Sequence, residues 1–140
     1  MLQAMEVVEL WKRTADSKQS NALARQYGFS SLYEADAVRK RPQRPQSDKY
    51  EINALYVGGA AFVTASYEMF AASGLEIKRS SPFEATFVLS CANGGHGYFA
   101  TEAAYDYGSY EGTNTPYAQG TAEEATQRMT EMLCKIYYND

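Results

Sequence analysis

The chain begins with apolar residues at helical spacing. Four of them recur at every third position: Leu2, Met5, Val8 and Trp11. Side chains at this spacing share one face of a helix, so the pattern predicts an amphipathic helix over about residues 2–15. Glu6 and Glu9 lie within the same stretch, which is not typical of a secretory signal peptide. We therefore expect no signal peptide in this chain, and its compartment stays open.

Two shorter helices are predicted next. Residues 18–26 favour a second helix that ends near Gly28, because glycine commonly follows the last turn of a helix. Ser31 and Glu34 have the three-residue spacing of a capping box, which predicts a third helix over about residues 31–38.

Residues 39–49 are rich in proline, glutamine and charge, which predicts a linker. The linker contains a basic cluster: Arg39, Lys40, Arg41 and Arg44. Two interpretations stay open, a solvated loop and a contact with phosphate or with a partner. The whole chain has a net charge of −4 and a pI near 5.0, which disfavours a dedicated nucleic-acid binder.

The apolar period changes from helical to alternating after Tyr50. Ile52, Ala54 and Tyr56 alternate with polar or small residues, and Gly58-Gly59 then supplies a turn. Residues 60–64 are apolar and β-prone. This pattern predicts a hairpin or two adjacent strands.

Two further elements are predicted after the hairpin. Ser66 is a suitable cap for a helix over about residues 67–78, with Glu68 in its first turn, where the helix dipole favours an anion. Residues 83–91 are short, aromatic and β-branched, which predicts a strand apolar enough to lie at the centre of a sheet.

The remainder of the chain combines a glycine-rich segment with a helix. Residues 92–120 hold several glycines and tyrosines and predict a long ordered loop, a type of segment that is often functional. Thr121 and Glu124 have capping-box spacing, and an apolar helical face follows as far as Ile136. Together the elements predict an α+β fold, in which helices pack a mixed β-sheet between a helical N-terminal lead and a C-terminal amphipathic helix.

Length and composition are those of one domain or of a fragment of a larger one. The chain has 140 residues, of which 45% are hydrophobic, so it can bury a core. We expect a helical lead with its linker over residues 1–49 and an α+β core over residues 50–140. Two cysteines without close spacing give no support for a disulfide framework. No apolar stretch approaches the ~20 residues of a membrane span.

The second half carries a family resemblance. Eight segments contribute to it, in this order: Phe62–Phe70, Gly74–Lys78, Ser81–Phe83, Phe87–Leu89, Ala92–Thr101, Ala104–Tyr105, Gly108–Glu111 and Tyr117–Thr121. Their order and spacing are similar to those of neutral/alkaline, non-lysosomal ceramidase-like proteins over roughly residues 50–138. The resemblance implies the C-terminal part of the catalytic region of a zinc-dependent amidohydrolase, which hydrolyses an N-acyl amide bond in a lipid.

The same resemblance assigns site residues. It places a zinc-binding glutamate at Glu68, a zinc-binding tyrosine at Tyr98, and at Tyr110 a tyrosine that polarises the amide carbonyl. His96 lies beside Tyr98 in the glycine-rich segment, so His96 and Asn93 are candidate substrate-binding residues, with an exposed loop histidine and a turn-forming asparagine as the alternatives. The family often has other residues at the positions of Gly94, Gly95 and His96. The two zinc-binding histidines of the family come from an earlier part of its chain and have no counterpart here. Glu68 has its own alternative, a helix-terminal carboxylate, and the tyrosines can equally be packing residues.

Two functions follow from these predictions. In the first, the chain is part of a hydrolase that is inactive in isolation, and its partner is the missing N-terminal half that carries the other zinc ligands. In the second, it is a non-catalytic interaction domain that keeps the fold and associates with itself through exposed apolar surface. Zinc belongs to the complete site, and we expect none in the isolated chain.

Overall fold

The computed structural model describes residues 1–138 and divides the chain into two units, Met1–Asp48 and Lys49–Asp140. The boundary lies one residue from the one predicted between the helical lead and the α+β core. Each unit contains its own cluster of buried apolar side chains. No helix within residues 1–138 has both the length and the apolar character needed to cross a membrane.

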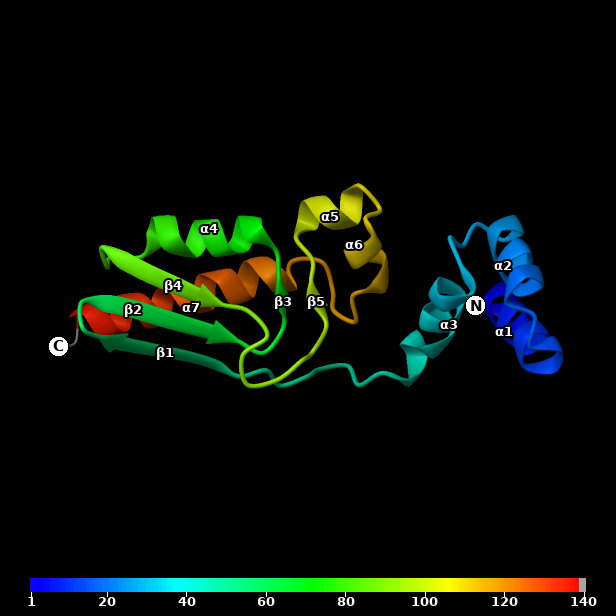
Figure 1. The fold of residues 1–140 in the computed structure, drawn as a ribbon, viewed down its shortest axis with the longest axis horizontal. Coiled ribbons are helices and arrows are strands. Elements are labelled where there is room, and N and C mark those ends of the chain that lie inside the picture. The colour runs from blue at the N-terminus through cyan, green and yellow to red at the C-terminus, as the bar shows by residue number, and fades with distance from the viewer. Residues whose placement is uncertain (139–140) are drawn as a thin grey trace. The chain divides into compact units, whose positions relative to one another are not determined.

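The first unit consists of helices. They are α1 (Leu2–Thr14), α2 (Ser17–Gln26), α3 (Leu32–Lys40) and the 3₁₀ turn η1 (Arg41–Gln43). The Asp16 carboxylate accepts the Lys18 and Gln19 N–H groups and begins α2, and the Ser31 hydroxyl accepts the Glu34 N–H at 3.3 Å and begins α3. The three predicted helices are therefore present (Figure 1).

The predicted apolar stripe of α1 coincides with its buried face only at Val8. Ala4, Val7 and Val8 are buried against α2 and α3, whereas Leu2 is 80% exposed and Trp11 is 44% exposed. Ala4 has no bulk beyond its β-carbon, so it allows the helices to approach closely. The larger apolar side chains consequently lie on the outer side of α1.

Part of the basic cluster belongs to a helix rather than to a loop. Arg39 and Lys40 close α3, and both pair with Asp36, at 2.6 Å and 2.5 Å. Burial alone would raise the pKa of Asp36, but the hydrogen bonds from Lys40 and Arg39 outweigh it and lower that pKa. Both cations therefore share one carboxylate within their own helix, which offsets one of their two charges.

The second unit contains a three-stranded mixed sheet. Its order is β1 (Ile52–Val57), β2 (Ala60–Ala65), β4 (Ala85–Leu89), with β1 antiparallel and β4 parallel to β2. Gly58 and Gly59 have φ of 59° and 86°, which suits the tight turn of the predicted β1–β2 hairpin. The mixed sheet and its helices confirm the α+β class.

The central strand is β2, not the segment 83–91 for which the centre was predicted. β2 pairs with a strand on each side, and on one face its Ala61, Val63 and Ala65 are fully buried beneath helices. β4 pairs on one side only, and its Phe87 and Leu89 are about half exposed. Part of the apolar composition of β4 therefore belongs to side chains on an open face of the sheet, and β4 is not buried on both faces.

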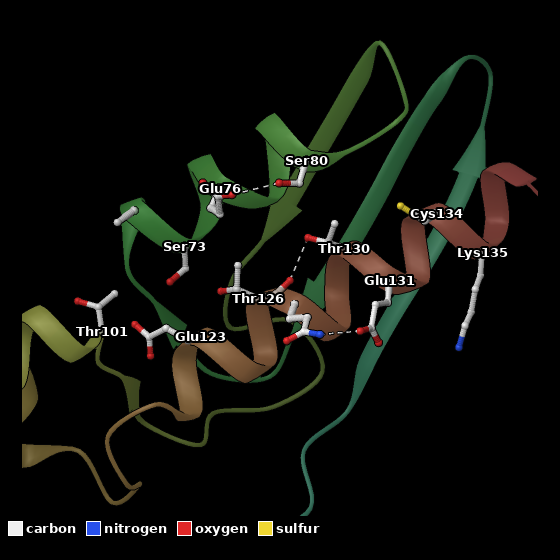
Figure 2. A pocket seen from close by; sticks show the side chains of 12 residues that line it. Ser73, Glu76, Ser80, Thr101, Glu123, Thr126, Thr130, Glu131, Cys134 and Lys135 are labelled. Carbon is white, nitrogen blue, oxygen red and sulfur yellow. Dashed lines mark hydrogen bonds between the residues drawn. The ribbon is translucent and has the colours of Figure 1, made fainter.

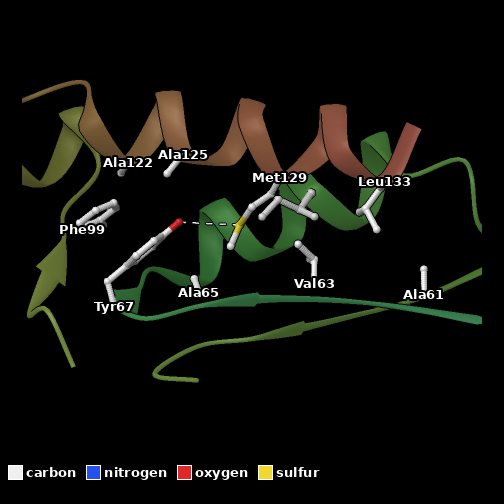
Figure 3. Packing of buried hydrophobic residues seen from close by; sticks show 10 residues of the cluster. Ala61, Val63, Ala65, Tyr67, Phe99, Ala122, Ala125, Met129 and Leu133 are labelled. Atoms are coloured by element: carbon white, nitrogen blue, oxygen red, sulfur yellow. Dashed lines mark hydrogen bonds between the residues drawn. The ribbon is translucent and has the colours of Figure 1, made fainter. Parts of the chain in front are cut away.

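Two helices cover one face of the sheet. They are α4 (Ala71–Ser80) and α7 (Thr121–Tyr138), which lie side by side (Figures 1 and 2). Figure 3 shows α7 packing Met129 and Leu133 onto β2. At one end of this core the Tyr67 and Phe99 rings stack, and the Tyr67 hydroxyl lies 3.7 Å from the Met129 sulfur (Figure 3).

The C-terminal amphipathic helix is confirmed, but its predicted capping box is not formed. Thr121 is already within α7, and its hydroxyl donates to the Ala118 carbonyl at 2.7 Å. The Glu124 N–H bonds to the Gly120 carbonyl. Backbone groups of the preceding turn thus take the place of the threonine side chain.

The other face of the sheet is apolar and open. Leu55 and Leu89 are 60% and 44% exposed, and the Phe62 and Phe87 rings stack between their strands at 5.0 Å. A shallow depression of about 390 Å³ lies on this face. We refer to Leu55, Phe62, Phe87 and Leu89 as the open sheet face.

Candidate functional site

Glu68 lies in a short strand, not in the first turn of a helix as predicted. The strand is β3 (Glu68–Met69), and α4 begins only at Ala71. Ser90 holds this segment extended, because its hydroxyl donates to the Tyr67 carbonyl at 2.8 Å and accepts the Met69 N–H at 2.9 Å. The predicted helix over residues 67–78 therefore starts about four residues later.

A second short strand places Tyr98 beside Glu68. β5 (Tyr98–Phe99) runs parallel to β3, with Glu68 and Tyr98 as partners across the pair (Figure 1). The Glu68 N–H donates to the Gly97 carbonyl at 2.8 Å. On its other side, the Tyr98 carbonyl accepts the Thr115 hydroxyl at 2.6 Å. The backbone of both residues is therefore fixed.

Tyr110 reaches the same place from a helix. The segment predicted as a loop contains α5 (Glu102–Asp106) and α6 (Tyr110–Asn114) besides β5. Ser109 begins α6 by accepting the Gly112 N–H at 3.0 Å, which places Tyr110 at the first position of the helix. The Tyr98 and Tyr110 rings meet edge to face, with centroids 6.1 Å apart. We call Glu68, Tyr98 and Tyr110 the Glu68 cluster.

The charges around Tyr98 keep it protonated. The negative charge of Glu68 is the largest cause that raises the pKa of Tyr98, followed by desolvation and by the neighbouring Tyr110 hydroxyl. Glu111 adds a smaller effect of the same sign. Tyr98 is therefore a neutral hydrogen-bond donor at neutral pH. Glu111 was not assigned from the sequence, although it directly follows Tyr110.

His96 and Asn93 lie in the segment between β4 and β5. The His96 N–H donates to the Ser66 carbonyl at 2.9 Å. A β-carbon at Gly94 would lie 3.1 Å from the Ser66 β-carbon, which favours glycine there, and 3.4 Å from the His96 imidazole. Asn93 is exposed with φ of 64°, a left-handed conformation that asparagine tolerates, so its observed role is in the turn.

The Glu68 cluster contains two oxygen donors of the kind that can bind a metal ion. The Glu68 carboxylate and the Tyr98 phenol are two oxygen donors on neighbouring strands. Among the described residues, no group of three or more histidine, cysteine, aspartate or glutamate side chains could hold a metal ion. A tetrahedral zinc site takes three or four protein ligands, so these two oxygen donors would need further ligands from elsewhere. Because Tyr98 retains its proton, metal binding there would release a proton and would strengthen with pH.

The cluster is open to solvent. Glu68 is exposed, Tyr110 is 68% exposed, and Tyr98 is half-buried. Hydrolytic sites exclude bulk water around the reacting atoms, which this surface does not do alone. Comparison with known proteins finds no matching family model, curated protein or solved structure. The resemblance to the ceramidase-like proteins therefore stays a prediction.

Proposed function

We propose that this chain is a C-terminal portion of a zinc-dependent amidohydrolase similar to neutral ceramidase, and that the Glu68 cluster is its part of the active site. The supporting observation is the convergence of three residues that lie far apart in the sequence. β3, β5 and α6 bring a carboxylate and two phenols into one cluster. The remaining ligands, including the histidines, come from residues outside this chain in this proposal.

The side chains of the cluster divide between two roles. Glu68 and Tyr98 would hold the metal, and Tyr110 would donate a hydrogen bond to the oxygen of the N-acyl amide as charge develops there. Zinc, when bound, supplies a Lewis acid that activates water and polarises the carbonyl. Glu111 keeps the surroundings of Tyr98 negative, which favours a cation.

The proposal is tested by separating metal binding from turnover. In a longer form that contains the missing histidines, Glu68→Gln and Tyr98→Phe should each lower zinc affinity by at least about 10-fold, because they remove direct ligands. Tyr110→Phe should keep the zinc but lower kcat on an N-acyl amide by about 100-fold. The measurements are metal content after dialysis and amide hydrolysis.

Matched controls lie outside the cluster. Tyr107→Phe changes a phenol that is 88% exposed, and Glu84→Gln removes an exposed carboxylate between α4 and β4. Neither should alter zinc content or turnover. A zinc-loaded longer form in which Glu68→Gln and Tyr98→Phe change nothing would refute the assignment. We expect the 140-residue chain alone to show no hydrolase activity.

The open sheet face supports a second candidate, a non-catalytic assembly domain. Contiguous apolar surface of this kind is uncommon on proteins that act alone and marks interaction sites. Stacked Phe62 and Phe87 lie near its centre. In this alternative the chain associates through the sheet face, either with itself or with a missing segment, and the Glu68 cluster has no catalytic role.

Light scattering distinguishes this candidate. If the sheet face mediates self-association, Phe87→Glu should shift a concentration-dependent dimer to monomer, because a buried unpaired charge is costly. Tyr107→Glu, which places the same charge on an exposed residue away from the sheet, should leave the dimer intact. A wild-type chain that stays monomeric at all concentrations counts against self-association.

A further inference from the structure

A groove of about 720 Å³ runs between α4 and α7, away from the sheet and from the Glu68 cluster. None of the cluster residues lines it. Figure 2 shows it extending along α7 from Glu123 to Lys135, with α4 on the other side. It therefore needs an explanation of its own.

One buried hydroxyl points into this groove without a partner. Ser73 on α4 is 7% exposed, and its hydroxyl is directed toward the end where Thr101 and Glu123 lie (Figure 2). It makes no side-chain hydrogen bond to any residue in the part of the chain that the structure describes. The hydroxyl opens onto the groove and can accept a hydrogen bond from a ligand that binds there.

The charge along the groove is negative and spread out. Glu123 and Glu131 are eight residues apart on α7, which corresponds to about 12 Å along a helix, and Glu76 lies opposite on α4. No ion pair involves these carboxylates within residues 1–138. Their recorded hydrogen bonds are to neutral donors, such as the Glu102 N–H at 3.0 Å for Glu123. Among the residues that line the groove, three carboxylates face one cation, Lys135, so the groove carries a net negative charge.

The floor between the carboxylates is apolar. The Thr126 and Thr130 hydroxyls donate to helix carbonyls of α7, at 2.8 Å and 3.0 Å. This leaves their methyl groups for contact with a ligand, together with Ala72 and Cys134. The groove thus has negatively charged ends and an apolar middle.

We propose that this groove binds a linear aliphatic polyamine, independently of the amidohydrolase function. One terminal ammonium group donates to Ser73 and Glu123, the other reaches Glu131, and the methylene chain lies over the threonine methyls. An extended triamine of the spermidine type has its terminal nitrogens at a separation similar to the rise of about 12 Å between these two residues along the helix. A single metal ion cannot meet both of them, whereas distributed charge can.

Isothermal titration of the full chain with spermidine tests the proposal. We expect one saturable site, weakened by added salt because the contacts are partly exposed. Glu123→Gln and Glu131→Gln should each weaken binding about 3- to 10-fold, and Ser73→Ala about 3-fold, through loss of charged or hydrogen-bonded contacts. 1,4-Diaminobutane, which cannot span both ends, should bind at least about 10-fold more weakly.

Glu84→Gln is the matched control, because it removes the same charge from an exposed residue that does not line the groove. It should bind spermidine like the wild type. Circular dichroism and thermal unfolding verify that each variant is folded. The proposal is overturned by absence of saturable binding at millimolar spermidine, by equal weakening in Glu84→Gln, or by equally effective competition from Mg²⁺ at matched ionic strength.

Discussion

Tyr98 shows how a single residue acquires chemistry from its neighbours. Glu68 is its partner across two short strands, and Tyr110 meets its ring from a helix. Their combined effect raises the pKa of Tyr98, with the charge of Glu68 as the largest cause. The phenol therefore stays protonated unless a cation offsets that charge, which makes its titration a direct report on the cluster.

Glu68→Gln should lower the pKa of Tyr98 toward its ordinary value of about 10, because the amide carries no charge. The measurement is an NMR titration of the chain labelled at the tyrosine ζ-carbon. Glu111→Gln should move the pKa in the same direction by less, and Glu84→Gln should not move it. An unchanged Tyr98 pKa in Glu68→Gln would show that the two side chains do not interact in solution.

Tyr67 provides a second prediction at this scale. Burial is the main cause that raises its pKa, with a smaller contribution from Tyr50. Above about pH 10 the unfolded chain releases this proton while the folded chain retains it, so stability falls as pH rises. The slope for one group is at most about 1.4 kcal/mol per pH unit.

Tyr67→Phe should therefore make the decline in unfolding free energy above pH 10 shallower, as measured by denaturant titration at each pH. The variant also loses the contact with the Met129 sulfur, so its stability at neutral pH should fall slightly. Tyr107→Phe, at an 88% exposed position, is the control and should keep the wild-type slope. The same slope in Tyr67→Phe would contradict the argument.

Among the elements, periodicity predicted those whose burial repeats regularly. α7 and the β1–β2 hairpin were predicted because their patterns extend over several turns or over a glycine turn. The helix predicted at residues 67–78 begins later in the sequence than expected. Ser66 is a good capping residue in sequence, but in the structure it is buried beside Gly94. The wrong strand was predicted as the central one, because an edge strand with an apolar open face, such as β4, has the same apolar composition as a central strand.

Local sequence patterns could not predict that Tyr98 and Tyr110 lie beside Glu68. β3 and β5 are two residues each, too short for a recognisable period, and they pair across about thirty residues of chain. Only the family resemblance placed Glu68, Tyr98 and Tyr110 in one site. No sequence pattern predicted the groove between α4 and α7, because its residues lie on the polar sides of two amphipathic helices.

The packing of α5 against α6 controls where Tyr110 lies. A β-carbon at Gly112 would stand 2.6 Å from the Ala104 carbonyl oxygen, so backbone must move to admit it. Gly112→Ala should destabilise the second unit by about 1–3 kcal/mol. It should also displace Tyr110 from Tyr98, visible as a loss of NMR contacts between their rings. Gly95→Ala, where nothing lies within 4 Å, is the control and should preserve both.

At the scale of the whole molecule, two separate cores lie on one chain. The first contains Val7 and Ala24 among helices, and the second contains Val63 and Met129 between a sheet and its helices. Both proposed sites belong to the second unit, since the Glu68 cluster and the α4–α7 groove lie entirely within residues 49–140. The helical unit contributes no residue to either.

Each core should therefore set the stability of its own unit. Val7→Ala should lower the midpoint of unfolding followed by Trp11 fluorescence, with a loss of about 1–3 kcal/mol, and leave the NMR signal of Tyr67 on its wild-type curve. Met129→Ala should do the reverse, with a loss of about 2–5 kcal/mol. Trp11 is the single tryptophan of the chain, so excitation at long wavelength follows the first unit without interference from the second. If either substitution moved both probes together, the two units would unfold as one cooperative body.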